Sequence, residues 1–280
     1  MRKLVTEYTF NKYNDYAIVS EKSGSYKRLI KLNCDLGEGF GTWQMPHDQD
    51  IMPHIDMANI ACGYHAGDPS VLQSAIRWAK QCDVSIGAHP SYPDRQGFGR
   101  RHMAFTQQEL IPMLHYQIAA LEGMSKVQGK TLDYVKPHGA LYNDMMRDMT
   151  LFESVVKAIA DYSIDLPLVI QALPQTQPLQ NIAKQYGIKL LFEAFADRRY
   201  RDDGQLLSRR EPHAVLNLAE TLQQVQGMIN NGTVISQTGK RLTLSIDTVC
   251  VHGDSVHALD AVRQIRQLLP KVNSANAKQP

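Results

Sequence analysis

Short apolar or β-branched runs alternate with polar, glycine-rich turns and with segments of helical periodicity from Leu29 onward. Such alternation is typical of strands that are each followed by a helix. The apolar runs predict strands at 29–34, 57–62, 84–88, 132–136, 167–172, 188–193 and 247–251. The helical periodicity predicts helices at 70–82, 107–126, 151–161, 177–186, 213–230 and 255–269. Strands and helices in this order predict a parallel α/β architecture.

Two of the predicted helices begin with a capping box. In this motif a Thr side chain accepts the backbone N–H three residues on, and a Glu at that position accepts the N–H of the Thr. The boxes are Thr106 with Glu109 and Thr150 with Glu153. The segment 232–246 has a turn between two β-like runs and predicts a hairpin inserted before the last strand.

The chain divides into three parts. Residues 1–27, rich in Tyr, Lys and Ser, predict a weakly ordered N-terminal extension, with a short edge strand as the alternative. Residues 28–270 predict a single (β/α) domain, and 271–280 predict a polar tail. No GxGxxG or GxxxxGK[ST] turn follows a predicted strand. The open-sheet folds that bind nucleotides are therefore disfavoured, and a closed or nearly closed barrel is favoured.

Composition excludes several classes of protein. The 280 residues are 43% hydrophobic and 21% charged, which is typical of a globular chain. The net charge is only +2 and basic residues do not cluster, so nucleic acid is not an expected partner. No apolar stretch is long enough to span a membrane, and the first residues do not form a secretory signal. Four scattered cysteines without a CxxC pair predict reduced thiols in the cytoplasm.

Polar side chains cluster directly after the predicted strands. The carboxyl ends of parallel strands share one face of the fold, so these side chains are expected to converge there. The candidates are Asn33, Asp35, Glu38, His65, His89, Arg95, Arg101, Lys136, His138, Tyr142, Glu193, Asp197, Arg198 and His252.

Several of these residues also fit purely structural roles. A lone histidine in a glycine-rich turn is more often a cap or a solvated loop residue, but four of them at nearby strand ends are not expected by chance. Asp35 suits helix capping as well as chemistry, and helix capping is the favoured role for Asp254. Cys62 and Cys250 are interpreted as small core residues. Arginines beside the glycine-rich turns suit either solvated pairs or the binding of carboxylate or phosphate.

Two chemistries fit this set of residues. In the first, Asp35, His65 and His89 supply a carboxylate and two imidazoles to a divalent metal ion that assists hydrolysis. In the second, Asp35 or a histidine acts as a base on an amide, while Lys136 and an arginine stabilise the oxyanion. The sequence has no compact ligand motif such as HExxH, so the metal ligands are the weaker part of this prediction.

Six motifs together resemble the LamB/YcsF family, over about Leu29 to Leu269. They are NCDLGEGFG (33–41), ANIACGYHAGDP (58–69), GAHPSYPDRQGFGRR (87–101), VKPHGALYN (135–143), EAFADRRY (193–200) and CVHGD (250–254). The chain departs from the family pattern at His213, where the family usually has glycine, and in its N-terminal extension.

The resemblance implies a seven-stranded (β/α) barrel related to the glycoside hydrolase/deacetylase superfamily. It implies an A subunit of 5-oxoprolinase, which opens the lactam of 5-oxo-L-proline to give L-glutamate with hydrolysis of ATP. It also implies two partner subunits, B and C. Because no glycine-rich nucleotide loop is visible, the ATP step is expected mostly on those partners. A homo-oligomer and the need for a divalent metal stay open.

For the implied reaction, Asp35, His65 and His89 are hypothesised to handle water or a metal. Lys136 and His138 are hypothesised to bind the carbonyl or phosphate, and Arg95 or Arg101 the substrate carboxylate. The remaining strand-end residues are candidates for substrate binding. Two alternatives remain: a stand-alone metal-dependent deacetylase or other amidohydrolase, and a non-catalytic substrate-binding subunit.

Overall fold

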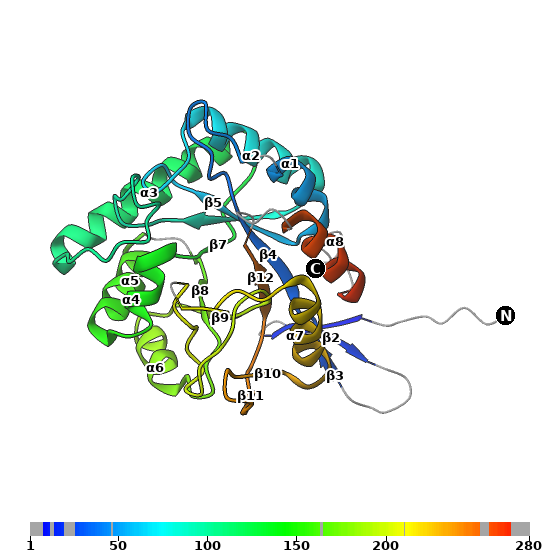
Figure 1. Ribbon diagram of the computed structural model, residues 1–280. Helices are drawn as coiled ribbons and strands as arrows, with labels where there is room; N and C mark the ends of the chain where they lie inside the picture. The colour runs from blue at the N-terminus through cyan, green and yellow to red at the C-terminus, as the bar shows by residue number, and fades with distance from the viewer. Residues whose placement is uncertain are drawn as a thin grey trace.

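The structure is a computed structural model that describes residues 8–11, 14–19, 26–45, 47–162, 165–209, 211–252 and 258–269. Its centre is a closed barrel of parallel strands, in the order β12-β4-β5-β6-β7-β8-β9, with the helices around the outside (Figure 1). The strands are β4 (Lys31–Leu36), β5 (Met57–Ala61), β6 (Ser85–His89), β7 (Tyr134–Val135), β8 (Leu168–Gln171), β9 (Leu190–Phe195) and β12 (Thr248–Val251). Each overlaps a predicted strand, so the predicted (β/α) barrel is confirmed.

The helices that cover the barrel largely match the predicted ones. They are α1 (Asp48–Ile51), the 3-10 helix η1 (Met52–His54), α2 (Pro69–Cys82), α3 (Gln107–Val127), α4 (Gly139–Met145), α5 (Met149–Asp161), α6 (Gln177–Gln185), α7 (Leu218–Asn231) and α8 (Ala258–Leu268). The short elements α1, η1 and α4 were not predicted. None of the helices in the described ranges is long and apolar enough to cross a membrane.

The first residues of the observed helices can be compared with the predicted capping residues. The Thr106–Glu109 capping box at α3 is confirmed. The box at Thr150 is wrong, because the Asp148 side chain accepts the N–H groups of Thr150 and Leu151 and α5 begins earlier. The predicted helix start at 213 is also wrong, because the Asn217 cap begins α7 at 218. The proposed cap Asp254 and residues 255–257 lie outside the described residues.

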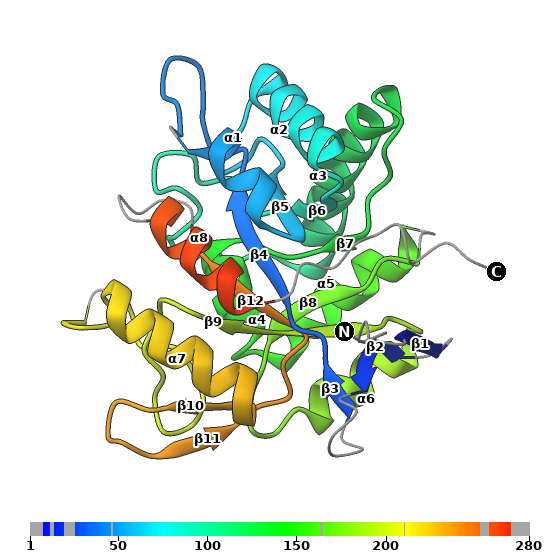
Figure 2. The same cartoon turned by 90° about the vertical axis from the view of Figure 1, so that its right-hand side faces the viewer.

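Two small sheets lie apart from the barrel. In the N-terminal extension, β1 (Tyr8–Asn11), β2 (Asn14–Val19) and β3 (Tyr26–Arg28) form an antiparallel sheet whose strands pair only with one another among the described residues. The predicted hairpin is confirmed as β10 (Thr233–Ile235) and β11 (Arg241–Thr243). Figure 2 shows both sheets at the same end of the molecule, away from α1 and α2.

The interior of the barrel is layered. Side chains alternate along a strand, so positions two apart on one strand face the same side. One layer is apolar and consists of Met57, Tyr134, Val169 and Leu191. Two residues further along three of those strands, toward their carboxyl ends, come Asn59, Lys136 and Glu193, all buried. The barrel is therefore plugged by apolar side chains and lined with polar ones at its carboxyl-terminal mouth, where barrel enzymes carry their active sites.

Candidate active site

A cavity of about 370 Å³ opens at the carboxyl ends of the barrel strands. Residues from the ends of β4, β6, β7, β9 and β12 reach it, together with the segment 206–209. Of the predicted site residues, those that line it are Asp35, His89, Lys136, His138, Tyr142, Arg198 and His252. This volume suits a small organic ligand.

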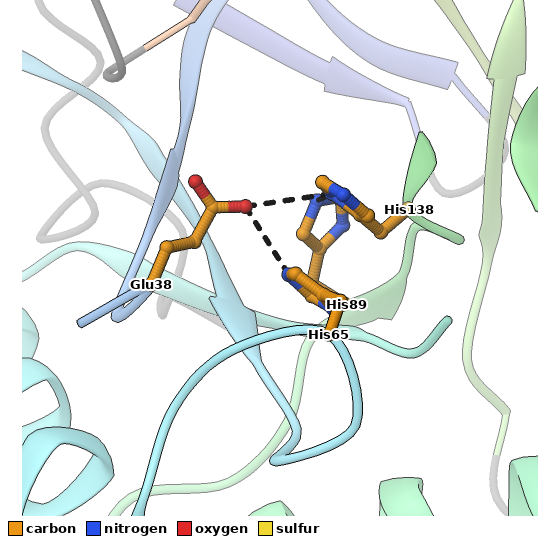
Figure 3. A group of neighbouring side chains, drawn as sticks. All are labelled: Glu38, His65, His89 and His138. Atoms are coloured by element: carbon orange, nitrogen blue, oxygen red, sulfur yellow. Dashed lines mark hydrogen bonds and ion pairs between the residues drawn. The ribbon is translucent and has the colours of Figure 1, made fainter. Parts of the chain in front are cut away.

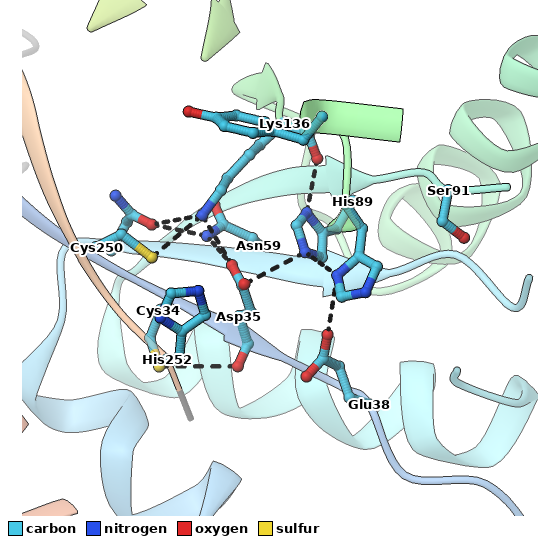
Figure 4. Close-up of polar contacts among 12 residues, drawn as sticks. Cys34, Asp35, Glu38, Asn59, His89, Ser91, Lys136, Cys250 and His252 are labelled. Atoms are coloured by element: carbon cyan, nitrogen blue, oxygen red, sulfur yellow. Dashed lines mark hydrogen bonds and ion pairs between the residues drawn. The ribbon is translucent and has the colours of Figure 1, made fainter. Parts of the chain in front are cut away.

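Lys136 occupies the centre of the site (Figure 4). Its Nζ lies 2.9 Å from Oδ1 of Asp35 and 2.8 Å from Oε1 of Glu193. It also contacts Asn33 Oδ1 at 3.3 Å and the sulfur of Cys250 at 3.2 Å. Burial alone would lower the pKa of Lys136, but Asp35, Cys250 and Glu193 raise it well above its usual value. The ammonium therefore stays charged at neutral pH.

Asp35 is held as a carboxylate from two sides. Burial alone would raise the pKa of Asp35, but Lys136 and His89 lower it well below its usual value. Asn59 Nδ2 donates to Asp35 Oδ1 at 2.7 Å, and the other oxygen lies 3.5 Å from His89 Nε2. Asn59 is itself oriented by the Tyr134 hydroxyl, which donates to its Oδ1 at 2.7 Å. Asp35 is therefore a charged carboxylate at the cavity, with one oxygen fixed by donors and the other facing an imidazole.

Four further side chains gather into one group (Figure 3), and one of them, His89, contacts Asp35. The group consists of Glu38, His65, His89 and His138, all buried, with donor atoms within 4.8 Å of one another. Glu38 Oε1 lies 3.2 Å from His65 Nε2 and 3.4 Å from His138 Nδ1. The rings of His65 and His138 are stacked with centroids 3.7 Å apart. Burial lowers the pKa of both rings well below the usual histidine value, so both are neutral at pH 7.

This group differs from the predicted metal set in the identity of the carboxylate. His65 and His89 belong to it as predicted, but Glu38 and His138 join them in place of Asp35. Asp35 instead lies with Cys250 and His252 in a second group of potential ligand atoms. Glu38 follows β4, the strand that carries Asp35, so the sequence offers both carboxylates as candidate ligands. Spacing alone does not say which of the two faces the imidazoles.

Four more of the predicted residues form two pairs beside the cavity, and one member of each pair, His252 and Tyr142, lines it. Asp197 accepts from Nδ1 of His252, with both oxygens at 2.9 Å. Burial alone would raise the pKa of Asp197, but His252 lowers it below its usual value. The Tyr142 hydroxyl donates to Glu193 Oε2 at 3.1 Å, so the two oxygens of Glu193 contact different partners.

Two of the predicted arginines, Arg95 and Arg101, lie outside the main cavity, and other arginines line it. Arg101 pairs with Asp94 at 2.8 Å and its side chain is 57% exposed. Arg95 stacks on Phe40 beside a different pocket. Neither lines the main cavity, because the turn at 94–101 folds back onto its own Asp94. The arginines that do line it are Arg100, Arg147, Arg198 and Arg209.

Sequence reasoning passed over Arg147 and Arg209 because neither follows a strand. Arg147 follows α4, and Arg209 lies in the long connection between β9 and α7. It also passed over Asn59 and Tyr134, which support Asp35 from inside the barrel. Both lie at alternate strand positions that face the interior, a signal that the apolar residues around them conceal.

A closed (β/α) barrel with acid, base and cationic side chains converging at its carboxyl-terminal mouth defines an enzyme-like α/β barrel protein. The chain belongs to the LamB/YcsF family, whose model matches residues 30–279.

The relatives and solved structures agree with that membership. A Vibrio parahaemolyticus protein that is named as the A subunit of 5-oxoprolinase is 48% identical over 244 residues, covering 87% of this chain and 96% of the relative. A Pseudomonas putida protein that carries the same name, numbered 2, is 47% identical over 251 residues, covering 89% and 97%. The crystal structure of a lactam utilization protein from Thermus thermophilus superposes with a TM-score of 0.78 at 36% identity, covering 85% and 95%.

Proposed function

We propose that this protein is the A subunit of a cytoplasmic, ATP-dependent 5-oxoprolinase that opens the lactam of 5-oxo-L-proline to L-glutamate. The observation that carries the proposal is the near-full-length similarity to proteins named as the A subunit of 5-oxoprolinase. The chemistry of the cavity supports it, because a carboxylate base, a buried ammonium and several arginines suit hydrolysis of an anionic amide.

We assign the substrate carboxylate to the arginines that line the cavity, in particular Arg198. Burial and the nearby Arg209 lower the pKa of Arg198 to about 10, so its guanidinium remains charged at neutral pH. Nε of Arg198 is buried without a hydrogen-bond partner among the described residues. An incoming carboxylate supplies an acceptor for that donor, and a planar guanidinium binds carboxylates in a fixed orientation.

The lactam carbonyl is assigned to the Lys136 side of the cavity. A five-membered lactam is an unreactive amide, and phosphorylation of its oxygen makes the carbon electrophilic. The ammonium of Lys136 stabilises negative charge on that oxygen. Asp35 takes a proton from the attacking water, which bonds to the carbonyl carbon. The carbon–nitrogen bond then breaks, and the leaving nitrogen takes a proton from His252, which lines the cavity. The ring-opened product carries the phosphoryl group on its new carboxyl as an acyl phosphate, and a second water cleaves that bond to give L-glutamate and inorganic phosphate.

The ATP step is assigned to the partner subunits B and C. The chain has no glycine-rich phosphate loop after any strand, and the relatives' name describes one component of a multisubunit enzyme. In this division of labour the barrel receives the activated lactam and adds water to it.

The test is ADP release that depends on 5-oxoproline, measured with this chain alone, with subunits B and C alone, and with all three together. Activity is expected only in the full mixture. In that mixture, Asp35→Asn is expected to lower kcat by about 10²- to 10⁴-fold, because the general base is lost. Asp50→Asn, which changes an exposed carboxylate on α1, is the matched control and is expected to keep full activity.

Three outcomes would count against the proposal. Ring opening by this chain alone without ATP would point instead to a stand-alone amidohydrolase. No activity in any mixture of folded subunits would remove the 5-oxoprolinase assignment. Full activity of Asp35→Asn in the mixture would reduce the role of this chain to substrate binding, with the chemistry on its partners.

A further inference from the structure

The outer hydrogen bonds of His89 and His138 fix which ring nitrogen carries the proton. His89 Nδ1 lies 2.6 Å from the backbone oxygen of Lys136. His138 Nε2 lies 2.9 Å from the backbone oxygen of Phe98. A carbonyl oxygen only accepts, so each of these nitrogens is an N–H donor. The inner nitrogens, Nε2 of His89 and Nδ1 of His138, lie 2.9 Å apart, so at most one of them carries a proton toward the other, which is a bare acceptor.

The same reasoning applies to His65. Its Nδ1 lies 2.9 Å from the hydroxyl of Ser91, and that hydroxyl donates its single proton to the backbone oxygen of Tyr92 at 2.9 Å. The hydroxyl then accepts from Nδ1 of His65, while Nε2 of His65 lies 3.2 Å from Oε1 of Glu38, which also only accepts. The single proton of the neutral His65 ring cannot serve both contacts, so one of its two nitrogens faces an acceptor without a proton.

The inner nitrogens of all three rings converge with a carboxylate oxygen. Nε2 of His89 lies 2.9 Å from Nδ1 of His138. Oε1 of Glu38 lies 3.2 Å from Nε2 of His65 and 3.4 Å from Nδ1 of His138. Three imidazole nitrogens and a carboxylate oxygen that face one another in a buried space repel unless protons or a cation lie among them.

Protons satisfy this arrangement poorly. One proton bridges His89 and His138, but it leaves His65 Nε2 against Glu38 Oε1, so at least a second is required. A single divalent cation attracts all four lone pairs at once. Histidine nitrogens with a carboxylate are zinc-class ligands, and tetrahedral donors about 2.0–2.1 Å from zinc lie about 3.3 Å from one another. Three of the six separations are 2.9–3.4 Å and bracket that value, and all six are within 4.8 Å.

We propose that Glu38, His65, His89 and His138 bind one divalent transition-metal ion of the zinc class, as a structural site. Outer hydrogen bonds from ligating histidines to carbonyl and hydroxyl oxygens are the usual support of such ions. Binding tilts the stacked rings of His65 and His138 apart, because both inner nitrogens must aim at one ion.

The surroundings shield one side of the site. Glu38 and His65 do not line the cavity, whereas His89 and His138 do. The turn at Gly99 covers the two stacked rings so closely that an added Cβ would lie 2.7 Å from His138 and 2.8 Å from His65. Four protein ligands that leave no open position on the ion are typical of structural rather than catalytic zinc. The ion would join the carboxyl ends of β4, β5, β6 and β7, and it would hold Lys136 through the bond from His89 to its backbone.

The experiment uses the full chain without a histidine tag, stripped with a chelator and dialysed against Zn²⁺ or Co²⁺. We expect one ion per chain by elemental analysis, the visible bands of four-coordinate Co²⁺, and a rise in Tm of several degrees on adding Zn²⁺. His65→Gln and Glu38→Gln are expected to lose the bound ion and the rise in Tm. His102→Gln is the matched control, because His102 is an exposed histidine paired with Asp144, and it is expected to bind metal normally.

Wild-type protein that binds neither Zn²⁺ nor Co²⁺ would overturn the proposal, and so would unchanged binding in His65→Gln and Glu38→Gln. If one variant fails to fold, the other variant and the wild-type dialysis still decide. The measurement needs neither substrate nor the other subunits, so its outcome is independent of the proposed 5-oxoprolinase activity.

Discussion

The carboxyl group of Asp48 is buried beneath the loop that carries Glu38. Its Oδ2 accepts the backbone N–H of Gly37 at 2.8 Å. Burial raises the pKa of Asp48 from 3.8 to about 7, and the nearby Glu38 adds to the rise. Between about pH 4 and pH 7 the folded chain therefore holds a proton that the unfolded chain releases. The free energy of unfolding should fall as pH rises through this range and level off above it.

Asp48→Asn removes this dependence while keeping an oxygen for Gly37. The variant should match wild type near pH 4 and exceed it at pH 8 by a few kcal/mol, since each pKa unit corresponds to about 1.4 kcal/mol. Urea unfolding at pH 5 and pH 8 measures the difference. Asp50→Asn, an exposed carboxylate on the same helix, should show no such gap. An equal effect of Asp48→Asn at both pH values would contradict the raised pKa.

At this scale the sequence predicted the strand-end residues well and the distant ones poorly. Asp35, Lys136 and His138 meet in the cavity because strand ends in a barrel must converge. Arg101 was misjudged, because its own turn offers Asp94 as a nearer partner than the cavity. Which loop arginine reaches the cavity depends on how connections between strands fold back, and strand periodicity carries no such information.

Strand β6 shows how an element positions the site through its packing. Gly87 lies on β6 next to Tyr134 of β7, and a Cβ at position 87 would overlap the Tyr134 ring. The Tyr134 hydroxyl orients Asn59, which in turn donates to Asp35. The glycine is therefore required by a close approach between neighbouring strands rather than by an unusual backbone angle.

Gly87→Ala should push the Tyr134 ring away and disturb the donors to Asp35. We expect a loss of about 1–3 kcal/mol in stability from overpacking, together with a fall in kcat in the reconstituted assay. Gly123→Ala in α3 is the control, since no atom lies within 4 Å of its added Cβ. It should be neutral or stabilising by up to about 1 kcal/mol. Equal melting curves for the two variants would refute the overlap at Gly87.

Elements with strong periodicity were the ones that the sequence predicted. The long helices α2 and α3 match their predicted ranges to within a residue. The short α4 was missed because it begins at a glycine and has no side-chain cap. The start of α5 was misplaced because Thr150 and Asp148 both offer capping oxygens, and only the backbone path decides between them. Competing local signals of equal strength are resolved by tertiary packing.

The whole barrel depends on joining its first strand to its last. β12 pairs with β4 on one side and β9 on the other, which closes the ring. Helix α8 then buries Ala258, Val262 and Ile265 against the barrel. Its Arg266 pairs with both oxygens of Asp56 at 2.9 Å, and Asp56 accepts the N–H of Leu32 on β4. The end of the described chain thus secures the strand that begins the barrel.

The N-terminal extension contributes no strand to that ring, so a chain that starts at residue 28 should fold as the full chain does. Its β1, β2 and β3 pair only with one another among the described residues, whereas the family match begins at residue 30. We expect removal of residues 1–27 to change Tm by no more than a few degrees and to preserve activity in the full mixture. A chain that stops at 252 is the contrasting variant, because it loses α8 and the Arg266–Asp56 pair, and we expect it not to fold. Circular dichroism melting of both chains measures this. If the chain lacking residues 1–27 also failed to melt cooperatively, the domain boundary would lie within the extension, and the sheet that it forms would be part of the barrel's stability.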